Sequence, residues 1–312
     1  MQIRDRITGL TDHSWGSDLW ISVSGLTLGQ FLFCVGTLLF LIPVLSLWVD
    51  SLKWIFLMHS SLTQGAAMKL AWRQLPIVCY SMLGSLVVPG RLSEFAGRCS
   101  FYPLNQHPRV MASTLMASST QWLWVLALPA LWILGYSTMS SDVTEDPVSF
   151  QVTFRGLPDT FWRGLTNPVW GGIMLGLAAG AAMLWWRIFK QLQVHGWSTS
   201  ALMQVYGWSF IRYGILVLQW FLWLTYASIT TDAWIVLGAI SCMLALQWFM
   251  PLGLFMDLGF KGALSLWIWG DVLRHSEDAL VIPLMLWVTN LVIPALMGGM
   301  WWLFIGQKIK AV

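Results

Sequence analysis

The sequence predicts an all-α polytopic membrane protein with about seven or eight membrane helices. Of its 312 residues, 57% are hydrophobic and only 10% are charged, whereas about a quarter of the residues in a soluble domain are charged. Windows such as Leu19–Val49 and Ala279–Gly306 contain no charged residue and match or exceed the ~20 apolar residues that span a bilayer. Many of the 23 tryptophans, including Trp48 and Trp54, lie near the ends of apolar runs, which is typical of the membrane interface. We therefore expect a single membrane domain over residues 1–312.

The apolar runs give the expected helices in chain order. Leu19–Val49 is interrupted by Pro43 and could be one tilted helix or a helix with an interfacial turn. A weaker segment, Lys53–Trp72, and a run too short for an untilted span, Leu75–Pro89, come next. The later runs are Met111–Gly135, Pro168–Trp186, Ala201–Ala227, Ala233–Met256 and Ala279–Gly306. We expect the short run before Pro89 and the run interrupted by Pro251 to form broken, re-entrant segments.

Basic residues predict the orientation, because short cytoplasmic loops carry an excess of Lys and Arg. Basic pairs flank the apolar runs near both ends of the chain and after residue 186. They are Arg4 with Arg6, Arg187 with Lys190, and Lys308 with Lys310. We therefore expect both termini in the cytoplasm and the acidic segment 136–167 to form an extracytoplasmic loop.

Two interrupted segments resemble each other. The first runs from Pro89 to Arg98 and the second from Pro251 to Lys261. In each, a proline ends an apolar run, a carboxylate follows five or six residues later, and a cation follows four residues after the carboxylate. Residues at i and i+4 share a helix face, so we expect two acid–base pairs, Glu94 with Arg98 and Asp257 with Lys261. Two ordinary helix boundaries at the membrane surface could also give this pattern.

Interrupted helices at matching positions in two halves indicate a binding site near the membrane midplane of a transporter. We therefore expect an inverted repeat with halves at about residues 20–135 and 168–306, whose broken segments meet near the centre of the protein. Each broken segment is followed by a span with polar groups. These are Thr114, Ser118 and Gln121 after the first segment, and Asn290 after the second.

An arginine lies near the middle of the run Ala201–Ala227. A charge at that depth costs at least ~2.5 kcal/mol on insertion scales, so Arg212 must face a polar site or a partner. Glu94 and Asp257 are the carboxylates that we expect to face it. Gln219 lies on approximately the same helix face as Arg212. Arg212 is therefore either part of a structural ion pair or a ligand of an anionic headgroup.

Four ordered pieces of the sequence resemble the membrane region of lysylphosphatidylglycerol synthases, in particular their stand-alone, flippase-like members. The first piece consists of Lys53-Trp54, Pro89-Gly90-Arg91, Glu94 to Arg98, and Ser118 to Gln121. The second consists of Ser209 to Tyr213 with Gln219, and the third of Pro251 with Asp257 to Ala263. The fourth consists of Trp287, Asn290 and Ile293-Pro294. The chain departs from the family at Ser93, where glycine is usual, and at Lys261, where arginine is frequent. Lysine at the latter position replaces a bidentate phosphate ligand with a point charge.

The resemblance implies a protein of the bacterial cytoplasmic (inner) membrane that binds or translocates a phospholipid or lipid-linked amphiphile with an anionic or zwitterionic headgroup. We expect no enzyme activity, because the soluble aminoacyl-transfer domain of full-length synthases is not recognisable here, and the sequence contains no phosphate-binding loop motif that would indicate ATP as a cofactor. The expected lipid-binding residues are Arg91, Glu94, Arg98, Gln121, Arg212, Tyr213, Gln219, Asp257, Lys261 and Asn290.

The alternative is a non-transporting membrane subunit or scaffold that docks a partner enzyme or an envelope complex. Gly172, Gly176 and Gly180 share one helix face, and small residues at this spacing let helices approach closely, either within the chain or with a protein partner or second copy. A net charge of +3 without basic clusters does not favour nucleic acid as a partner. The four cysteines and five histidines lack metal-ligand spacing, so we expect no metal site.

Overall fold

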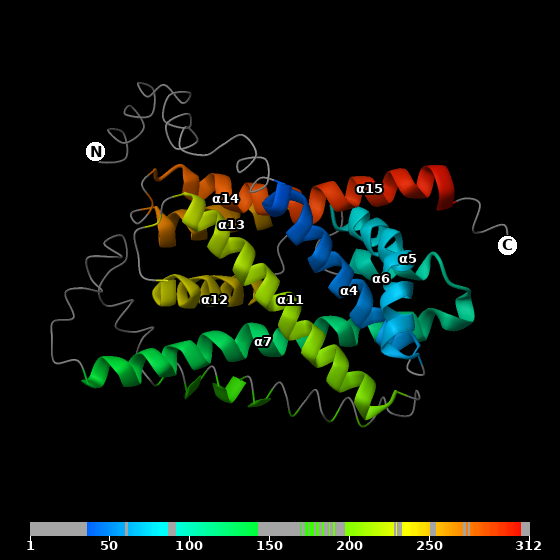
Figure 1. Cartoon of the computed structure of the whole chain (residues 1–312), viewed down its shortest axis with the longest axis horizontal. Helices are drawn as coiled ribbons and strands as arrows, with labels where there is room; N and C mark the ends of the chain where they lie inside the picture. The colour runs from blue at the N-terminus through cyan, green and yellow to red at the C-terminus, as the bar shows by residue number, and fades with distance from the viewer. Residues whose placement is uncertain are drawn as a thin grey trace, which may run out of the picture. The chain divides into compact units, whose positions relative to one another are not determined.

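The computed structural model describes residues 36–59, 62–86, 92–142, 197–227, 229, 233–249, 254–270, 273 and 275–306, together with scattered residues between 169 and 190. These residues form helices and turns without a β-strand (Figure 1), which confirms the predicted all-α class. The chain divides into two compact units, Met1–Leu41 and Ile42–Val312. In the smaller unit, the described element is a π-helical turn, Thr37–Leu41.

The larger unit contains the other elements that the structure describes. They are α4 (Ile42–Met58), α5 (Gln64–Leu83), a 3-10 turn (Gly84–Leu86), α6 (Leu92–Cys99), a 3-10 turn (Leu104–Gln106), α7 (His107–Asp142), α11 (Thr199–Tyr226), α12 (Ala233–Phe249), α13 (Leu254–Trp269), α14 (Asp278–Trp287), a π-helical turn (Val288–Val292), α15 (Ile293–Trp301) and a π-helical turn (Trp302–Gly306). Helix α11 begins with a side-chain cap, in which the Ser198 hydroxyl accepts a hydrogen bond from the Ala201 amide at 3.1 Å and satisfies one free amide of the first turn.

Four stretches of the described chain are long and apolar enough to cross a membrane: Leu39–Met58, Leu104–Gly135, Thr199–Tyr226 and Asp278–Phe304. The last three agree with the predicted runs 111–135, 201–227 and 279–306. Helix α12 is apolar but shorter than a typical span. The predicted run 168–186 lies mostly outside the described residues. The described helices therefore support a membrane protein.

The helix boundaries differ from the prediction in the first part of the chain. Helix α4 passes through Val49, where the first apolar run was expected to end, and residues 46–58 are all buried. The run from Leu75 is not a separate segment but the second half of α5, which begins at Gln64 and contains Pro76. Helix α7 extends to Asp142, so the first residues of the predicted loop 136–167 are helical. On α4, hydropathy failed because the polar side chains Asp50, Ser51 and Lys53 are buried against neighbouring helices.

Helix α4 lies at the centre of the polar part of this unit. It packs against α5, α7 and α11, while α5 also packs against α6 and α15. Helix α11 runs alongside α4 in the view of Figure 1, and the two helices are in contact. Tryptophans expected at the interface are instead interior on α4: Trp54 is fully buried and Trp48 is nearly so. This arrangement brings the polar side chains of α4 within reach of three neighbouring helices.

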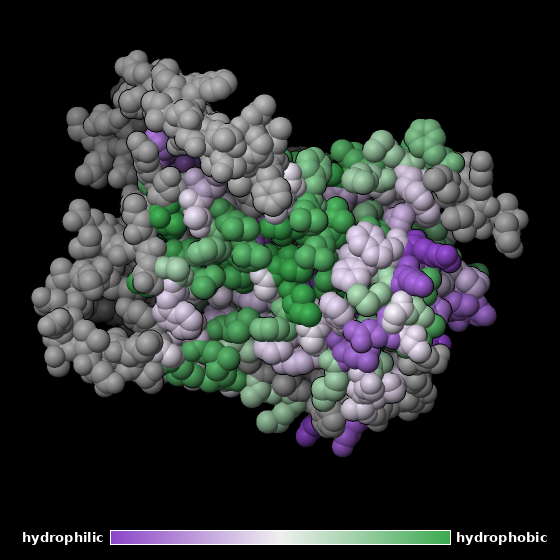
Figure 2. Space-filling model, in the orientation of Figure 1, coloured by the Kyte–Doolittle hydropathy of each residue, from purple (hydrophilic) through white to green (hydrophobic). Residues whose placement is uncertain are grey.

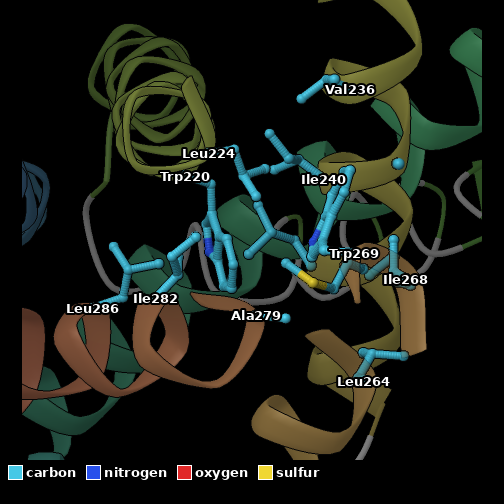
Figure 3. Close-up of a cluster of buried hydrophobic side chains, with 14 of the residues drawn as sticks. Trp220, Leu224, Val236, Ile240, Leu264, Ile268, Trp269, Ala279, Ile282 and Leu286 are labelled. Carbon is cyan, nitrogen blue, oxygen red and sulfur yellow. The ribbon is translucent and has the colours of Figure 1, made fainter. Parts of the chain in front are cut away.

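An apolar cluster joins α11, α12, α13 and α14. Figure 3 shows Trp220 and Leu224 of α11 directed toward Ile240 of α12, Trp269 of α13 and Ile282 of α14. Between helices in lipid, such side chains stabilise the assembly by van der Waals packing and not by exclusion of water. The cluster, to which Val125 of α7 also belongs, therefore holds these helices together without a charged group.

Close backbone contact between helices occurs at glycines other than those predicted. At Gly298 of α15 an added Cβ would overlap the backbone of Cys79 and Tyr80 on α5. By contrast, a Cβ at Gly172, Gly176 or Gly180 would meet no atom of the described residues within 4 Å, and all three glycines are exposed. The expected packing role within the chain is therefore not seen for this stripe in the described part of the structure.

The outer surface is largely apolar where the spans lie. Large hydrophobic side chains such as Leu115, Trp122, Phe210, Leu218 and Leu296 are exposed. Figure 2 shows apolar side chains over much of the described surface of one face, with hydrophilic side chains gathered on the side of α5 and α6. Apolar surface of this extent is unusual for a soluble monomer and agrees with helices that face lipid.

Candidate functional site: a buried carboxylate shared by three cations

Asp50 of α4 is a buried carboxylate that contacts cations from three helices. Its side chain is 7% exposed. Arg98 of α6 donates a hydrogen bond from Nη2 to Asp50 Oδ2 at 2.9 Å, and Arg212 of α11 donates from Nη1 to Asp50 Oδ1 at 2.5 Å. Lys53, one turn further along α4, places Nζ 3.3 Å from Asp50 Oδ1. We call these four residues the Asp50 cluster.

Lys53 is the most enclosed cation of the Asp50 cluster. Its side chain is fully buried, and Nζ also donates a hydrogen bond to the backbone carbonyl of Ala117 on α7 at 3.0 Å. A lysine at this depth requires such partners, because a buried charge is costly unless it is paired and hydrogen-bonded. Lys53 therefore connects α4 to α7 and holds one oxygen of Asp50.

Arg98 is held on several sides. Besides Asp50, it lies 4.0 Å from the carboxylate of Glu94 one turn earlier on α6, and its guanidinium lies 5.3 Å from the centre of the Trp54 ring. Trp54 also packs edge-to-face against Tyr102, with ring centroids 5.6 Å apart. Burial raises the pKa of Tyr102 to about 12, although the nearby Arg98 acts to lower it. These contacts fix Arg98 in one position.

Arg212 is the most accessible cation of the Asp50 cluster. Its side chain is 14% exposed, compared with 2% for Arg98 and 0% for Lys53. Nη1 also donates to Oε1 of Gln121 on α7 at 2.9 Å. Its Nε has no hydrogen-bond partner among the described residues, and the same holds for Nε of Arg98. Both arginines therefore retain donors that an added anion could use.

Three cations and two carboxylates of the described residues meet at this site. Asp50 and Glu94 supply the two negative charges, and Lys53, Arg98 and Arg212 supply the three positive charges. These side chains are largely buried, and Asp50 and Lys53 each take part in a further interaction. Because burying a charge costs free energy unless an opposite charge offsets it, this electrostatic environment favours an anion.

Neutral polar side chains extend the site along α7 and α11. Gln121, Thr114 and Ser118, the predicted polar stripe of α7, are all buried. Thr120 of α7 and Ser209 of α11 share a hydrogen bond of 2.7 Å. Ser209 lies three residues before Arg212 on α11. Further along α11, the Asn290 amide donates to Gln219 Oε1 at 2.9 Å. The structure thus joins Arg212 to Gln121, and Gln219 to Asn290, as two separate polar contacts.

The expected carboxylate partner of Arg212 was wrong. Arg212 contacts Asp50, whereas Glu94 lies beside Arg98 and Asp257 pairs with Lys261 at 2.6 Å. The two i, i+4 pairs themselves are therefore confirmed. Asp50 was missed because it follows the first apolar run, where a charge resembles a span end. Its spacing to Lys53, one turn apart within a helix that remains apolar through Met58, was the available signal.

The other predicted site residues lie elsewhere or outside the described chain. Helix α6 packs chiefly against α5 and α7, while α13 packs chiefly against α12 and α14, so the described parts of the two broken segments have different neighbours. Asp257 and Lys261 are partly exposed on α13. Tyr213 belongs to the apolar cluster and not to the Asp50 cluster. Arg91 and the two prolines, Pro89 and Pro251, lie outside the described residues.

The described residues contain no group of three or more His, Cys, Asp or Glu side chains that could hold a metal ion. In comparisons with known proteins, no family model matches the chain, and no curated protein or solved structure matches it. The chemistry of the site therefore rests on its own residues, which form a buried, hydrogen-bonded, electropositive centre.

Proposed function

We propose that this protein binds and translocates a phospholipid, or another lipid-linked amphiphile, whose headgroup carries an anionic phosphate. The observation that carries this proposal is the sharing of one buried carboxylate, Asp50, by three cations. An anion that approached the Asp50 cluster would be attracted by its three cations. It would also meet arginine N–H donors that have no partner among the described residues.

Arg212 is the residue that we assign to the headgroup. It is the least buried of the three cations, whereas Lys53 and Arg98 are enclosed by α7, Trp54 and Glu94. Arginine presents a planar set of donors that suits the oxygens of a phosphate. Lys53 and Arg98 then act as positioning residues that hold Asp50, and Asp50 holds Arg212 when no headgroup is bound.

The finer architecture belongs to the same proposal. We propose seven or eight membrane helices in an inverted repeat, in a bacterial inner membrane with both termini in the cytoplasm, as the resemblance to stand-alone flippase-like relatives of lysylphosphatidylglycerol synthases implies. Four candidate spans and the matching acid–base pairs on α6 and α13 support it. The proposal assigns no catalytic residue and no aminoacyl transfer to this chain.

A lipid-binding measurement with variants of Arg212 tests the function. The purified protein would be titrated with a short-chain phosphatidylglycerol and, separately, with the diacylglycerol of the same chains, which lacks the phosphate. We expect the wild type to prefer the phosphatidylglycerol. Arg212→Ala should lose this preference by about tenfold or more, because a hydrogen bond to a charged group contributes about 1.5–3 kcal/mol. Arg212→Lys should keep part of it, since lysine retains the charge but not the planar donors.

Arg73 on α5 supplies the matched control, because it is an exposed arginine. Arg73→Ala should leave the preference for phosphatidylglycerol unchanged. Folded yield and melting temperature would be measured on the same preparations, so that a loss of structure is separated from a loss of binding. Equal preference for the phospholipid in wild-type protein and well-folded Arg212→Ala would contradict the proposal.

A second candidate function is docking of a protein partner or second copy through Gly172, Gly176 and Gly180. The observation that favours it is that no atom of the described residues lies within 4 Å of a Cβ added at any of the three glycines. Replacement of Gly176 by isoleucine should then disrupt the assembly without changing phosphatidylglycerol binding. Size-exclusion chromatography with light scattering would measure the assembly, and an unchanged mass in the variant would count against docking through this face.

A further inference from the structure

A second polar contact lies on the same side of α11 as Arg212. Gln219 follows Arg212 by seven residues, which is nearly two helical turns, or about 10 Å along the axis. Its side chain is fully buried. Gln219 Oε1 accepts a hydrogen bond from the Asn290 amide at 2.9 Å, so α11 contacts the π-helical turn Val288–Val292 at this point.

Gln219 has an unused hydrogen-bonding atom. Its Nε2 is buried and has no hydrogen-bond partner among the described residues. If both amides of the pair were rotated by half a turn, the contact with Asn290 would survive and the unused atom would be Oε1 instead. In either orientation, a buried polar group is left without a partner, which costs free energy unless a ligand supplies one.

The surroundings of this pair restrict what that ligand group can be. Trp220 and Leu286, close to Gln219 and Asn290 in sequence, belong to the apolar cluster (Figure 3). The Thr289 hydroxyl is already used, since it donates to the Met285 carbonyl at 2.9 Å. A charged group would be poorly solvated here, whereas a neutral oxygen needs only one hydrogen bond. Single π-helical turns within α-helices occur frequently at functional sites, and Asn290 lies in one.

We propose that Gln219 and Asn290 form a neutral subsite that binds an uncharged oxygen, a carbonyl or hydroxyl, of the same amphiphile whose phosphate contacts Arg212. This inference rests on the proposed function and adds a second requirement to it. The ligand carries a phosphate and a neutral oxygen, which are bound by two long side chains whose backbone positions are about 10 Å apart along α11. In a phospholipid, that oxygen is either an ester carbonyl of the acyl chains or a hydroxyl of a polyol headgroup.

The test compares three ligands that differ in these oxygens. Phosphatidylglycerol carries both ester carbonyls and a polyol, its ether-linked analogue lacks the carbonyls, and phosphatidic acid lacks the polyol. Dissociation constants would be measured for wild type, Gln219→Met and Asn290→Ala. Gln219→Met should weaken binding of phosphatidylglycerol by about three- to tenfold, the usual effect of one neutral hydrogen bond, and should leave unchanged the affinity for the ligand that lacks the recognised oxygen.

The ligand that becomes insensitive to Gln219→Met identifies the source of the oxygen. Insensitivity of the ether analogue assigns the subsite to a carbonyl, and insensitivity of phosphatidic acid assigns it to the headgroup hydroxyls. Asn290→Ala provides a second variant in case methionine disturbs the fold. If every ligand responds equally to both variants, the neutral subsite is overturned while Arg212 still discriminates for phosphate. If the wild type does not discriminate for phosphate, the proposed function itself fails.

Discussion

Asp50→Asn is the perturbation that most directly tests the structural role of the Asp50 cluster. The substitution preserves the shape of the side chain but removes the negative charge between Lys53, Arg98 and Arg212. At an effective dielectric constant of about 20, a unit charge pair at the 2.9 Å separation of Arg98 and Asp50 attracts by roughly 6 kcal/mol before desolvation. We expect a smaller loss, because removal of one partner from a buried ion pair costs about 3–5 kcal/mol.

That loss should be visible as a large shift in melting temperature. At about 2.1 cal/mol/K per residue, a chain of 312 residues has an unfolding entropy of about 0.65 kcal/mol/K, so each kcal/mol moves the midpoint by about 1.5 °C and we expect Asp50→Asn to melt about 5–8 °C below the wild type. The assay is thermal unfolding in detergent, followed by tryptophan fluorescence or by loss of the monodisperse chromatographic peak. A companion variant, Asp50→Asn with Arg212→Met, removes one of the three cations and should recover part of the loss.

Asp257→Asn is the matched control, because Asp257 also pairs with a lysine but is 25% exposed. Partly exposed i, i+4 pairs contribute about 0.3–0.5 kcal/mol, so this variant should melt within about 2 °C of the wild type. If Asp50→Asn and Asp257→Asn had the same small effect, the Asp50 cluster would not stabilise the fold, and the reasoning from buried charge would be refuted.

Three further outcomes are expected. Gly298→Ala should destabilise the protein by about 1–3 kcal/mol through overlap with the backbone of α5, whereas Gly299→Ala, whose Cβ would meet only a flexible leucine side chain at 3.4 Å, should melt close to the wild type. The Tyr102 phenol should ionise near pH 12 in the folded protein and near pH 10 in the unfolded chain, so its contribution to stability is lost as the pH rises from about 10 to 12. The late step of the absorbance titration at 295 nm should be smaller by one tyrosine in Tyr102→Phe, and an unchanged amplitude would exclude Tyr102. Ser141→Cys should react with an impermeant thiol reagent from the extracytoplasmic side, and labelling only from the cytoplasm would reverse the proposed orientation.

The sequence was sufficient to predict the helical class, three of the described spans and several contacts of the polar centre. Apolar runs of membrane length have few alternatives to helices, because backbone groups in lipid must be hydrogen-bonded within the segment. Glu94 with Arg98 and Asp257 with Lys261 were predictable, since the i, i+4 spacing fixes their geometry. Arg212 was recognisable as a residue that needs a partner because of its depth within an apolar run.

The identity of that partner was not predictable by the same reasoning. Local spacing shows which residues share a helix face but not which helices face each other. Asp50 resembled the end of a span because hydropathy averages over a window and treats each charge as a cost. A hydropathy average leaves out the favourable interaction of Asp50 with Lys53, which lies on the same face of the same helix and lowers the cost of burying that charge. Similarly, the repeat of Gly172, Gly176 and Gly180 suggested helix packing, whereas the close approach occurs at Gly298.

The pairing of Asp50 with Arg212 has a consequence for how the chain enters the membrane. If helices are inserted in chain order, α4 enters with Asp50 and Lys53 only one turn apart, so each charge has a neighbour of opposite sign from the start. Helix α11 enters later with an isolated arginine, whose insertion is costly until it reaches Asp50. We therefore expect the topology of α11 to depend on the earlier insertion of α4. A truncated chain that begins after residue 58 should insert α11 poorly, even though every residue of that helix is present.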